Sequence, residues 1–89
     1  MTSAELVRKA AILVGSQSAL ADAIGASPAM VWQWADGRRP VPIERAVQIE
    51  RATSGAVTRR DLRPDDWGDI WPELIDDEHP WPGPAKEAA

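Results

Sequence analysis

The fold is decided by the stretch Gln17-Ser-Ala-Leu-Ala-Asp-Ala-Ile-Gly-Ala-Ser-Pro-Ala-Met-Val-Trp-Gln-Trp-Ala-Asp-Gly37. Ser27-Pro28 is its sharpest local signal, because serine is among the best N-cap residues and proline is favoured at the first helical position. Gly25, two residues earlier, suits the left-handed conformation that a tight turn requires. The stretch therefore predicts two short helices, over residues 17–24 and from Pro28 to about Ala35, joined by that turn.

Two helices joined in this way must pack through small and branched residues. Ala21 allows a close approach, and the interior is filled by Leu20, Ile24, Ala26, Val31 and Trp34. This packing leaves the outer face of the second helix exposed, so that the helix can enter the major groove of DNA N-terminus first. The pattern predicts a helix-turn-helix over residues 17–37.

The side chains left outside this packing have chemistry suited to DNA. Gln33 can form two hydrogen bonds to adenine, and the methyl group of Ala29 can touch that of a thymine. Gln17 and Ser27 lie at helix N-termini, where the helix dipole and free N–H groups favour a phosphate. The pair Arg38-Arg39 follows the second helix and can neutralise backbone phosphates. An ordinary solvated arginine pair is the alternative.

The rest of the chain also has helical signals, so we expect an all-α fold. Thr2 and Glu5 match a capping box, which predicts a first helix over residues 3–14. A helix opened by Pro42 and a short turn of helix capped by Thr58 follow. Residues 66–74 place four apolar side chains at helical spacing, with Pro72 as an interruption: Trp67, Ile70, Trp71 and Leu74.

The 89 residues are enough for one domain, and charge divides them unevenly. Residues 1–60 carry eight Lys/Arg against five acids, net +3, whereas residues 61–89 carry two against nine, net −7. We therefore expect a DNA-binding domain over residues 1–75 and a disordered acidic tail, rich in Pro, Gly and Ala, over residues 76–89. The total of −4 does not exclude DNA, because the local patch sets the field there.

Other classes of protein fit the sequence poorly. The chain has no cysteine, no apolar run long enough for a membrane span and no secretory signal at Met1, so we expect a cytoplasmic, nucleoid-associated protein. No nucleophile and base are paired, and the lone His79 stands among acids with no fixed geometry. We expect no catalytic residues, no metal and no cofactor.

The segment resembles the helix-turn-helix of the lambda repressor-like, Cro/CI superfamily. The matching residues are Gln17, Leu20-Ala21, Ile24-Gly25, Ser27, Val31, Trp34 and Gly37. Residues 49–58 and 62–65 resemble more narrowly the YdaS-type antitoxin-like proteins or Cro-like phage repressors, so that the likeness covers about residues 6–74. It implies a compact five-helix domain and a repressor from a prophage or phage region. It also implies a homodimer on a palindromic double-stranded DNA operator.

By position, the resemblance implies roles for single residues. Gln17 and Ser27 correspond to phosphate contacts, and the residues at or near base edges are Pro28, Ala29, Trp32 and Gln33. Trp32 departs from the family, which usually has a smaller polar residue there, and it could instead pack on a neighbouring helix or a partner subunit. Base-specific donors are few, so DNA shape is expected to contribute.

Trp67 and Trp71 have two readings, as cover of the domain's own core or as contacts to a dimer or other partner. On the second reading, the chain is a protein-interaction module that neutralises a toxin or modulates another regulator through this segment. The two functions can coexist in one chain.

Overall fold

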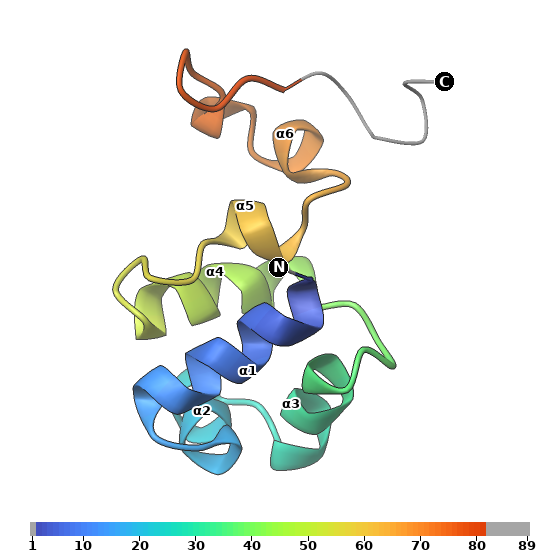
Figure 1. Cartoon of the computed structure of the whole chain (residues 1–89), viewed down its shortest axis with the longest axis vertical. Helices are drawn as coiled ribbons and strands as arrows, with labels where there is room; N and C mark the ends of the chain where they lie inside the picture. Colours follow the sequence, from blue (N-terminus) through green and yellow to red (C-terminus); the bar gives the residue numbers. More distant parts are fainter. Residues whose placement is uncertain (1, 82–89) are drawn as a thin grey trace.

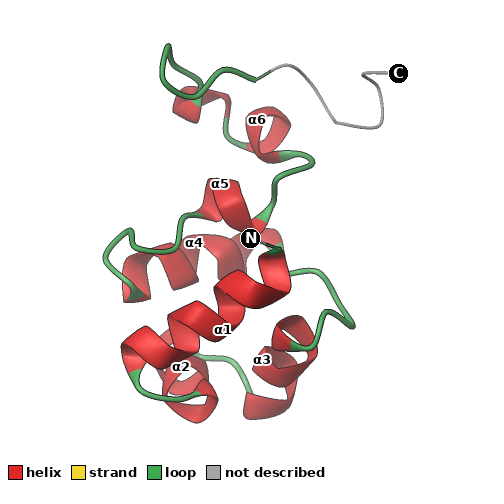
Figure 2. Ribbon diagram, in the orientation of Figure 1, coloured by secondary structure: helices red, strands yellow, loops and turns green. Residues whose placement is uncertain are grey.

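The computed structural model describes residues 2–81, and within them every regular element is a helix (Figures 1 and 2). The order is α1 (Ser3–Val14), α2 (Gln17–Ile24), α3 (Pro28–Ala35), α4 (Ile43–Ala52), α5 (Arg59–Leu62), α6 (Trp67–Ile70) and the 3₁₀ turn η1 (Pro72–Leu74). The all-α prediction is confirmed, and residues 2–81 form six α-helices where the resemblance implies five. The predicted bounds of the first three helices are also confirmed.

Local caps explain why these bounds could be predicted. The hydroxyl of Thr2 accepts from the N–H of Glu5 at 3.1 Å, and the Glu5 carboxylate accepts from the N–H of Thr2 at 3.3 Å. Ser16, Ser27 and Thr58 accept from the third residue beyond at 3.0, 3.2 and 3.1 Å. Each of these bonds satisfies an N–H that the helix itself leaves without a partner, so a helix starts where such a side chain stands.

The core lies where α1, α2, α3 and α4 meet. α1 packs against α2 and α3, and α2 packs in turn against α3 and α4 (Figure 1). The largest side chains that are shielded almost completely from solvent are Leu20, Ile49, Val7, Val31, Val41 and Val57. Burying a residue of this size contributes roughly 1.5–3 kcal/mol, so each of these positions stabilises the packing that holds the helix-turn-helix in place.

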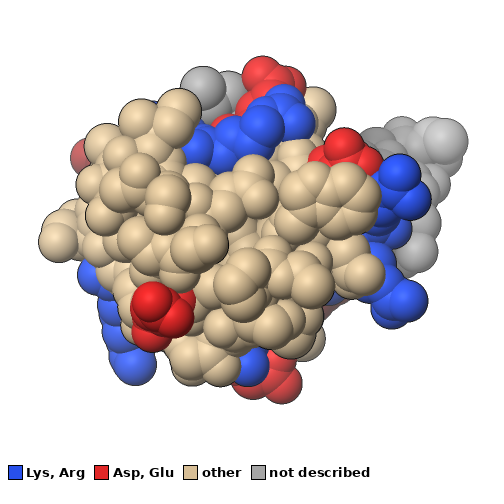
Figure 3. Space-filling view, turned by 90° about the horizontal axis from the view of Figure 1, so that it is seen from below, with Lys and Arg blue, Asp and Glu red and all other residues tan. Residues whose placement is uncertain are grey.

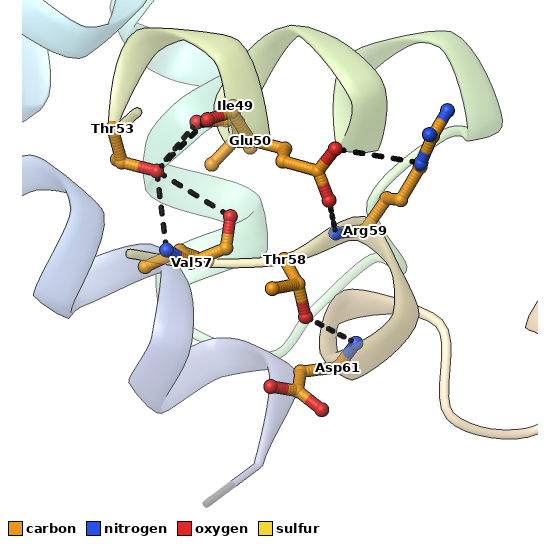
Figure 4. Close-up of polar contacts among 7 residues, drawn as sticks. All are labelled: Ile49, Glu50, Thr53, Val57, Thr58, Arg59 and Asp61. Atoms are coloured by element: carbon orange, nitrogen blue, oxygen red, sulfur yellow. Dashed lines mark hydrogen bonds and ion pairs between the residues drawn. The ribbon is translucent and has the colours of Figure 1, made fainter. Parts of the chain in front are cut away.

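Polar contacts fix α5 to α4 (Figure 4). The hydroxyl of Thr53 donates to the carbonyl of Ile49 at 3.0 Å and accepts from the N–H of Val57 at 3.1 Å, which pins the chain as it leaves α4. The Glu50 carboxylate accepts from the N–H of Arg59 at 3.0 Å, and its other oxygen lies 3.5 Å from the Arg59 Nε. The turn between the two helices is therefore held from both ends.

The prediction of a single helix over residues 66–74 is wrong in one respect. α6 ends at Ile70, Trp71 has φ −126° and ψ 69°, and a 3₁₀ turn follows. Pro72 explains the break, because it has no N–H and disfavours helical dihedrals in the residue before it. α6 and η1 lie at the opposite end of the molecule from α2 and α3 (Figure 1).

The described chain continues to pack after residue 75. The ring of Trp81 meets that of Trp67 edge to face, with centroids 5.0 Å apart, and the main chain of Asp76 and His79 closes a turn through bonds of 3.2 Å in both directions. Residues 82–89, the greater part of the expected disordered tail, lie outside the described residues.

Candidate nucleic-acid interface

The turn between α2 and α3 sets the angle at which α3 leaves α2. Gly25 has φ 72° and ψ 26°, the left-handed conformation that the sequence predicts for it. The N–H of Ala26 donates to the carbonyl of Ala21 at 2.9 Å, so the end of α2 is closed before α3 begins at Pro28. A side chain at Gly25 would be strained whatever the space around it.

α3 has one buried and one open face. Val31, Trp34 and Ala35 are buried against α1 and α2. The open face holds the four residues expected at base edges: Pro28 and Ala29 are exposed, Trp32 is 47% exposed, and Gln33 is half-buried. The structure thus leaves all four accessible, at least in part, and contact with DNA stays a prediction.

Seen from the end formed by α2 and α3, the surface is largely uncharged at its centre. Lys and Arg side chains lie toward its edges, and a few Asp and Glu side chains lie on the same face (Figure 3). Such an arrangement suits a duplex, whose uncharged base edges lie in the groove between two charged backbones. The acids of α6, η1 and the turn after them lie at the other end of the molecule (Figure 1).

Three side chains gather where α3 ends. The Arg38 Nε donates to Oδ2 of Asp36 at 2.7 Å, and the Arg38 guanidinium lies 4.9 Å from the centroid of the Trp32 ring. Gly37 has φ 76°, a turn that brings Arg38 back over the helix it has just left. Trp32 is therefore covered in part by Arg38, and the choice between DNA, a neighbouring helix and a partner subunit as its contact stays a prediction. The sequence analysis did not assign Asp36 to this site. The order Asp36-Gly37-Arg38 could have suggested the ion pair, because a turn at the glycine brings the acid and the arginine together.

A hollow of about 120 Å³ joins this cluster to the start of α2. Its lining combines α1, α2 and the end of α3, through Arg8, Gln17, Trp32, Ala35 and Asp36. Gln17 is half-buried there, whereas Ser27 is exposed at the opposite end of α3. The candidate phosphate contacts therefore fall into two groups, one at each end of α3. Arg39 belongs to the group at the C-terminal end and is exposed.

Several arginines counted in the basic half of the chain are used internally. The Nη1 of Arg8 donates to the carbonyl of Ala35, and that of Arg45 to the carbonyl of Ile24, both at 2.7 Å. Arg59 faces Glu50 and also lies over the ring of Trp71, at 5.4 Å from its centroid. These contacts leave the net charge unchanged but hold the three guanidinium groups to the protein itself, so they are less free to turn to a phosphate. Arg38 is also paired, with Asp36, whereas Arg39 is exposed.

Trp67 and Trp71 lie within the chain's own core, with 7% and 8% of their surface exposed. Arg60 covers the ring of Trp67 at 5.7 Å from its centroid. This burial matches the core alternative of the sequence analysis. It leaves little of either indole for a partner to contact.

Comparison with known proteins identifies the family. A family model described as "Bacterial toxin YdaS" matches residues 7–70. The chain belongs to the YdaS family. It is 51% identical over 61 residues to "Putative transcriptional regulator YdaS" of Escherichia coli (strain K12), a match that covers 67% of this chain and 62% of that relative. The match thus spans less than two thirds of that relative's length.

A solved structure extends the likeness to the fold. The Cro protein from "putative prophage element Xfaso 1" in Xylella fastidiosa strain Ann-1 is similar to this chain with 40% identity and a TM-score of 0.60, over 73% of this chain and 94% of that protein. This member of the YdaS family therefore has a Cro-like helix-turn-helix fold, which confirms the resemblance inferred from residues 17–37.

Among the described residues, no helix is long and apolar enough to cross a membrane. In the same part of the chain, no three His, Asp or Glu side chains are grouped closely enough to hold a metal ion.

Proposed function

We propose that this YdaS-family chain is a Cro-like transcriptional regulator that binds operator DNA with α3 in the major groove. The observation that carries the proposal is the open face of α3, where Trp32 and Gln33 stand beside the arginines that follow the helix. The names of the relatives, a transcriptional regulator and a Cro protein, support the same reading. The protein would act in the cytoplasm, at the nucleoid, and would originate from a prophage.

In the proposed complex, each exposed residue has one role. Gln33 hydrogen-bonds a base edge, Ala29 touches a thymine methyl group, and Pro28 and Trp32 fill the groove by van der Waals contact. Phosphates are bound by Gln17, Ser27, Arg38 and Arg39. Because only Gln33 among the four base-edge residues carries an amide, much of the specificity would come from DNA shape and deformability.

The regulator would bind as a homodimer. A two-fold pair of α3 helices reads half-sites about 10 base pairs apart, which matches one turn of B-DNA. Each half-site then needs few direct contacts, because affinity is shared between two subunits on one palindrome.

A role in neutralising or contacting a toxin has less support in this chain. That hypothesis used Trp67, Trp71 and the acidic tail as the contact surface. Both tryptophans are buried, and residues 82–89 of the tail lie outside the described residues. The word toxin belongs to the description of the family model. The described residues of this chain suggest no catalytic or pore-forming chemistry. DNA binding therefore remains the one function proposed.

In-vitro selection from a random duplex pool tests the proposal. We expect a palindromic consensus, and a complex that weakens steeply between 50 and 200 mM salt, roughly as expected when several phosphates are contacted. A Trp32→Ala/Gln33→Ala variant should lose the consensus, whereas Ile12→Ala, at an exposed position on α1, should keep it. Recovery of no consensus from the intact chain, with no retention of its own upstream region at low salt, would reject the proposal.

A further inference from the structure

The end of α3 contains an acid where a DNA-binding surface should disfavour one. Asp36 follows the helix directly, with φ −89° and ψ −3°, and its carboxylate is held by Arg38 at 2.7 Å. The two side chains are 46% and 64% exposed, so the pair stands in solvent rather than in the core. Exposed ion pairs add little to stability, so folding alone gives no strong reason for this one.

We propose that Asp36 is a positioning residue that holds Arg38 against the face of Trp32 in the free protein and competes with DNA phosphate for the Arg38 guanidinium. This inference rests on the proposed function, since it requires Arg38 to reach a phosphate. It assigns Asp36 a restraining effect on DNA affinity.

The geometry supports the positioning half of this inference. A guanidinium is planar, so it can keep one face on an aromatic ring while its edge donates to an oxygen. Arg38 does both, with its centre 4.9 Å from the Trp32 centroid and its Nε bound to Asp36. The carboxylate therefore fixes the direction of the guanidinium, and the guanidinium in turn restricts the indole that faces the groove.

The competition half follows from the chemistry of the two anions. Carboxylate and phosphate oxygens accept from the same guanidinium edge, so a phosphate can replace Asp36 while the stack on Trp32 persists. Asp36 also lines the hollow that contains Gln17, one of the proposed phosphate contacts. Once Arg38 has turned to a phosphate, the Asp36 carboxylate stands unpaired near DNA and is repelled by it.

The test compares Asp36→Asn, Asp36→Glu, Arg38→Ala and the double variant D36N/R38A on the selected duplex over a range of salt. The matched control is Asp61→Asn, which makes the same charge change at an exposed position of α5. In the protein without DNA, the indole N–H resonance of Trp32 reports the stack, and a Trp32→Phe variant assigns it.

We expect D36N to bind the selected duplex roughly 3- to 10-fold more tightly than the intact chain does. The slope of log affinity against log salt concentration should be steeper, by up to the amount that about one more phosphate contact adds. R38A should weaken binding, and D36N in the same chain should recover part of that loss. The effects of the two changes should also differ from their sum, because the residues contact each other. D36E should behave like the intact chain, D61N should change affinity less than about twofold, and only D36N among the acid variants should move the Trp32 resonance.

Equal or weaker DNA binding by D36N overturns the inference, as does a gain that D61N reproduces. Additive effects in the double variant, or a Trp32 resonance that D36N leaves unmoved, overturn it as well. These failures are distinct from failure of the proposed function, in which the intact chain itself selects no duplex.

Discussion

The Nη1 of Arg8 on α1 donates a 2.7 Å hydrogen bond to the carbonyl of Ala35, the last residue of α3. The last four carbonyls of a helix have no partner within it, and its C-terminus carries partial negative charge. α3 has no basic residue in its own last turn, so α1 supplies one across 27 positions of sequence. The end of the proposed recognition helix is thus fixed by a residue that itself lies outside the proposed DNA contacts.

Replacing Arg8 should therefore affect both stability and DNA binding. We expect Arg8→Gln to lower the free energy of unfolding by about 1–2 kcal/mol, because a charge-assisted bond to the helix end is lost. DNA affinity should fall as well, since the end of α3 that carries Trp32 is less well held. Urea denaturation and anisotropy titrations measure the two effects.

Lys9→Gln is the matched control for this change. It removes the same charge from the neighbouring position, which is exposed and has no hydrogen bond to α3. We expect its stability to stay within about 0.5 kcal/mol of the intact chain, as for most surface substitutions. Equal losses from the two variants would mean that Arg8 acts only through net charge.

Gln33 and Arg39 should separate base reading from backbone binding. Gln33→Ala should cost roughly 1–3 kcal/mol on the preferred duplex and relax the consensus at one position, because a hydrogen bond to a base edge is lost. Arg39→Ala should weaken all duplexes alike and reduce the salt slope by about one contact. Selection with each variant, followed by titration against matched and mismatched duplexes, measures both.

Arg51→Ala serves as the control for charge, since Arg51 is an exposed arginine on α4. It should leave the consensus intact and reduce the salt slope less than Arg39→Ala does. If Gln33→Ala and Arg39→Ala instead weakened every duplex by the same factor, the roles assigned to them would be refuted.

The sequence predicts the helix bounds well because the signals that set them are local. Thr2 with Glu5, Ser16, and Ser27 with Pro28 each determine a helix start within four residues of themselves. The same locality explains why the first three helices match their predicted bounds. It also explains the start of α5, where Thr58 caps the turn as its spacing to Asp61 suggests.

What the sequence does not reveal depends on contacts that no local pattern encodes. The Arg8 bond to Ala35 and the Arg45 bond to Ile24 require the tertiary fold, so both arginines read as free surface charge. The Arg38 stack on Trp32 depends on the reversal at Gly37. Pro72 differs from these, because its restriction of the dihedral angles of Trp71 is local and could have ended the predicted helix at Ile70 from the sequence alone.

Gly68 offers a test of how residues 76–81 attach to the domain. A Cβ added at Gly68 would fall on the indole ring of Trp81, which lies edge to face with Trp67. We expect Gly68→Ala to displace Trp81, to shift tryptophan emission to the red, and to lower stability by about 0.5–1.5 kcal/mol, the size of one aromatic pair. Fluorescence spectra and urea denaturation measure these changes.

Trp81→Ala should give a similar loss, and the double variant Gly68→Ala/Trp81→Ala should lose little more than either single one. Their effects are not additive because both remove the same contact. A Gly68→Ala protein with unchanged emission and stability would show that Trp81 does not rest on Gly68 in solution.

Glu5 should make part of the stability depend on pH. The Glu5 carboxylate accepts hydrogen bonds from the N–H of Thr2, which has the larger effect, and from the Thr2 hydroxyl. Both bonds favour the charged form and therefore lower the pKa of Glu5 from 4.5. Below pH 4.5 the unfolded chain takes up the proton first, so this contribution is complete above pH 4.5 and is lost as pH falls through the folded pKa.

The difference in unfolding free energy between the intact chain and Glu5→Gln, measured from pH 7 to pH 3, isolates this residue. Asp76 also has a lowered pKa, chiefly because the N–H of His79 donates to it, but it titrates in both proteins and cancels from the difference. We expect the difference to be constant above pH 4.5 and to shrink below it, with Thr2→Val reducing the dependence because the hydroxyl donor is gone. A difference that stayed flat down to pH 3 would mean that the capping box at the start of α1 does not form in solution.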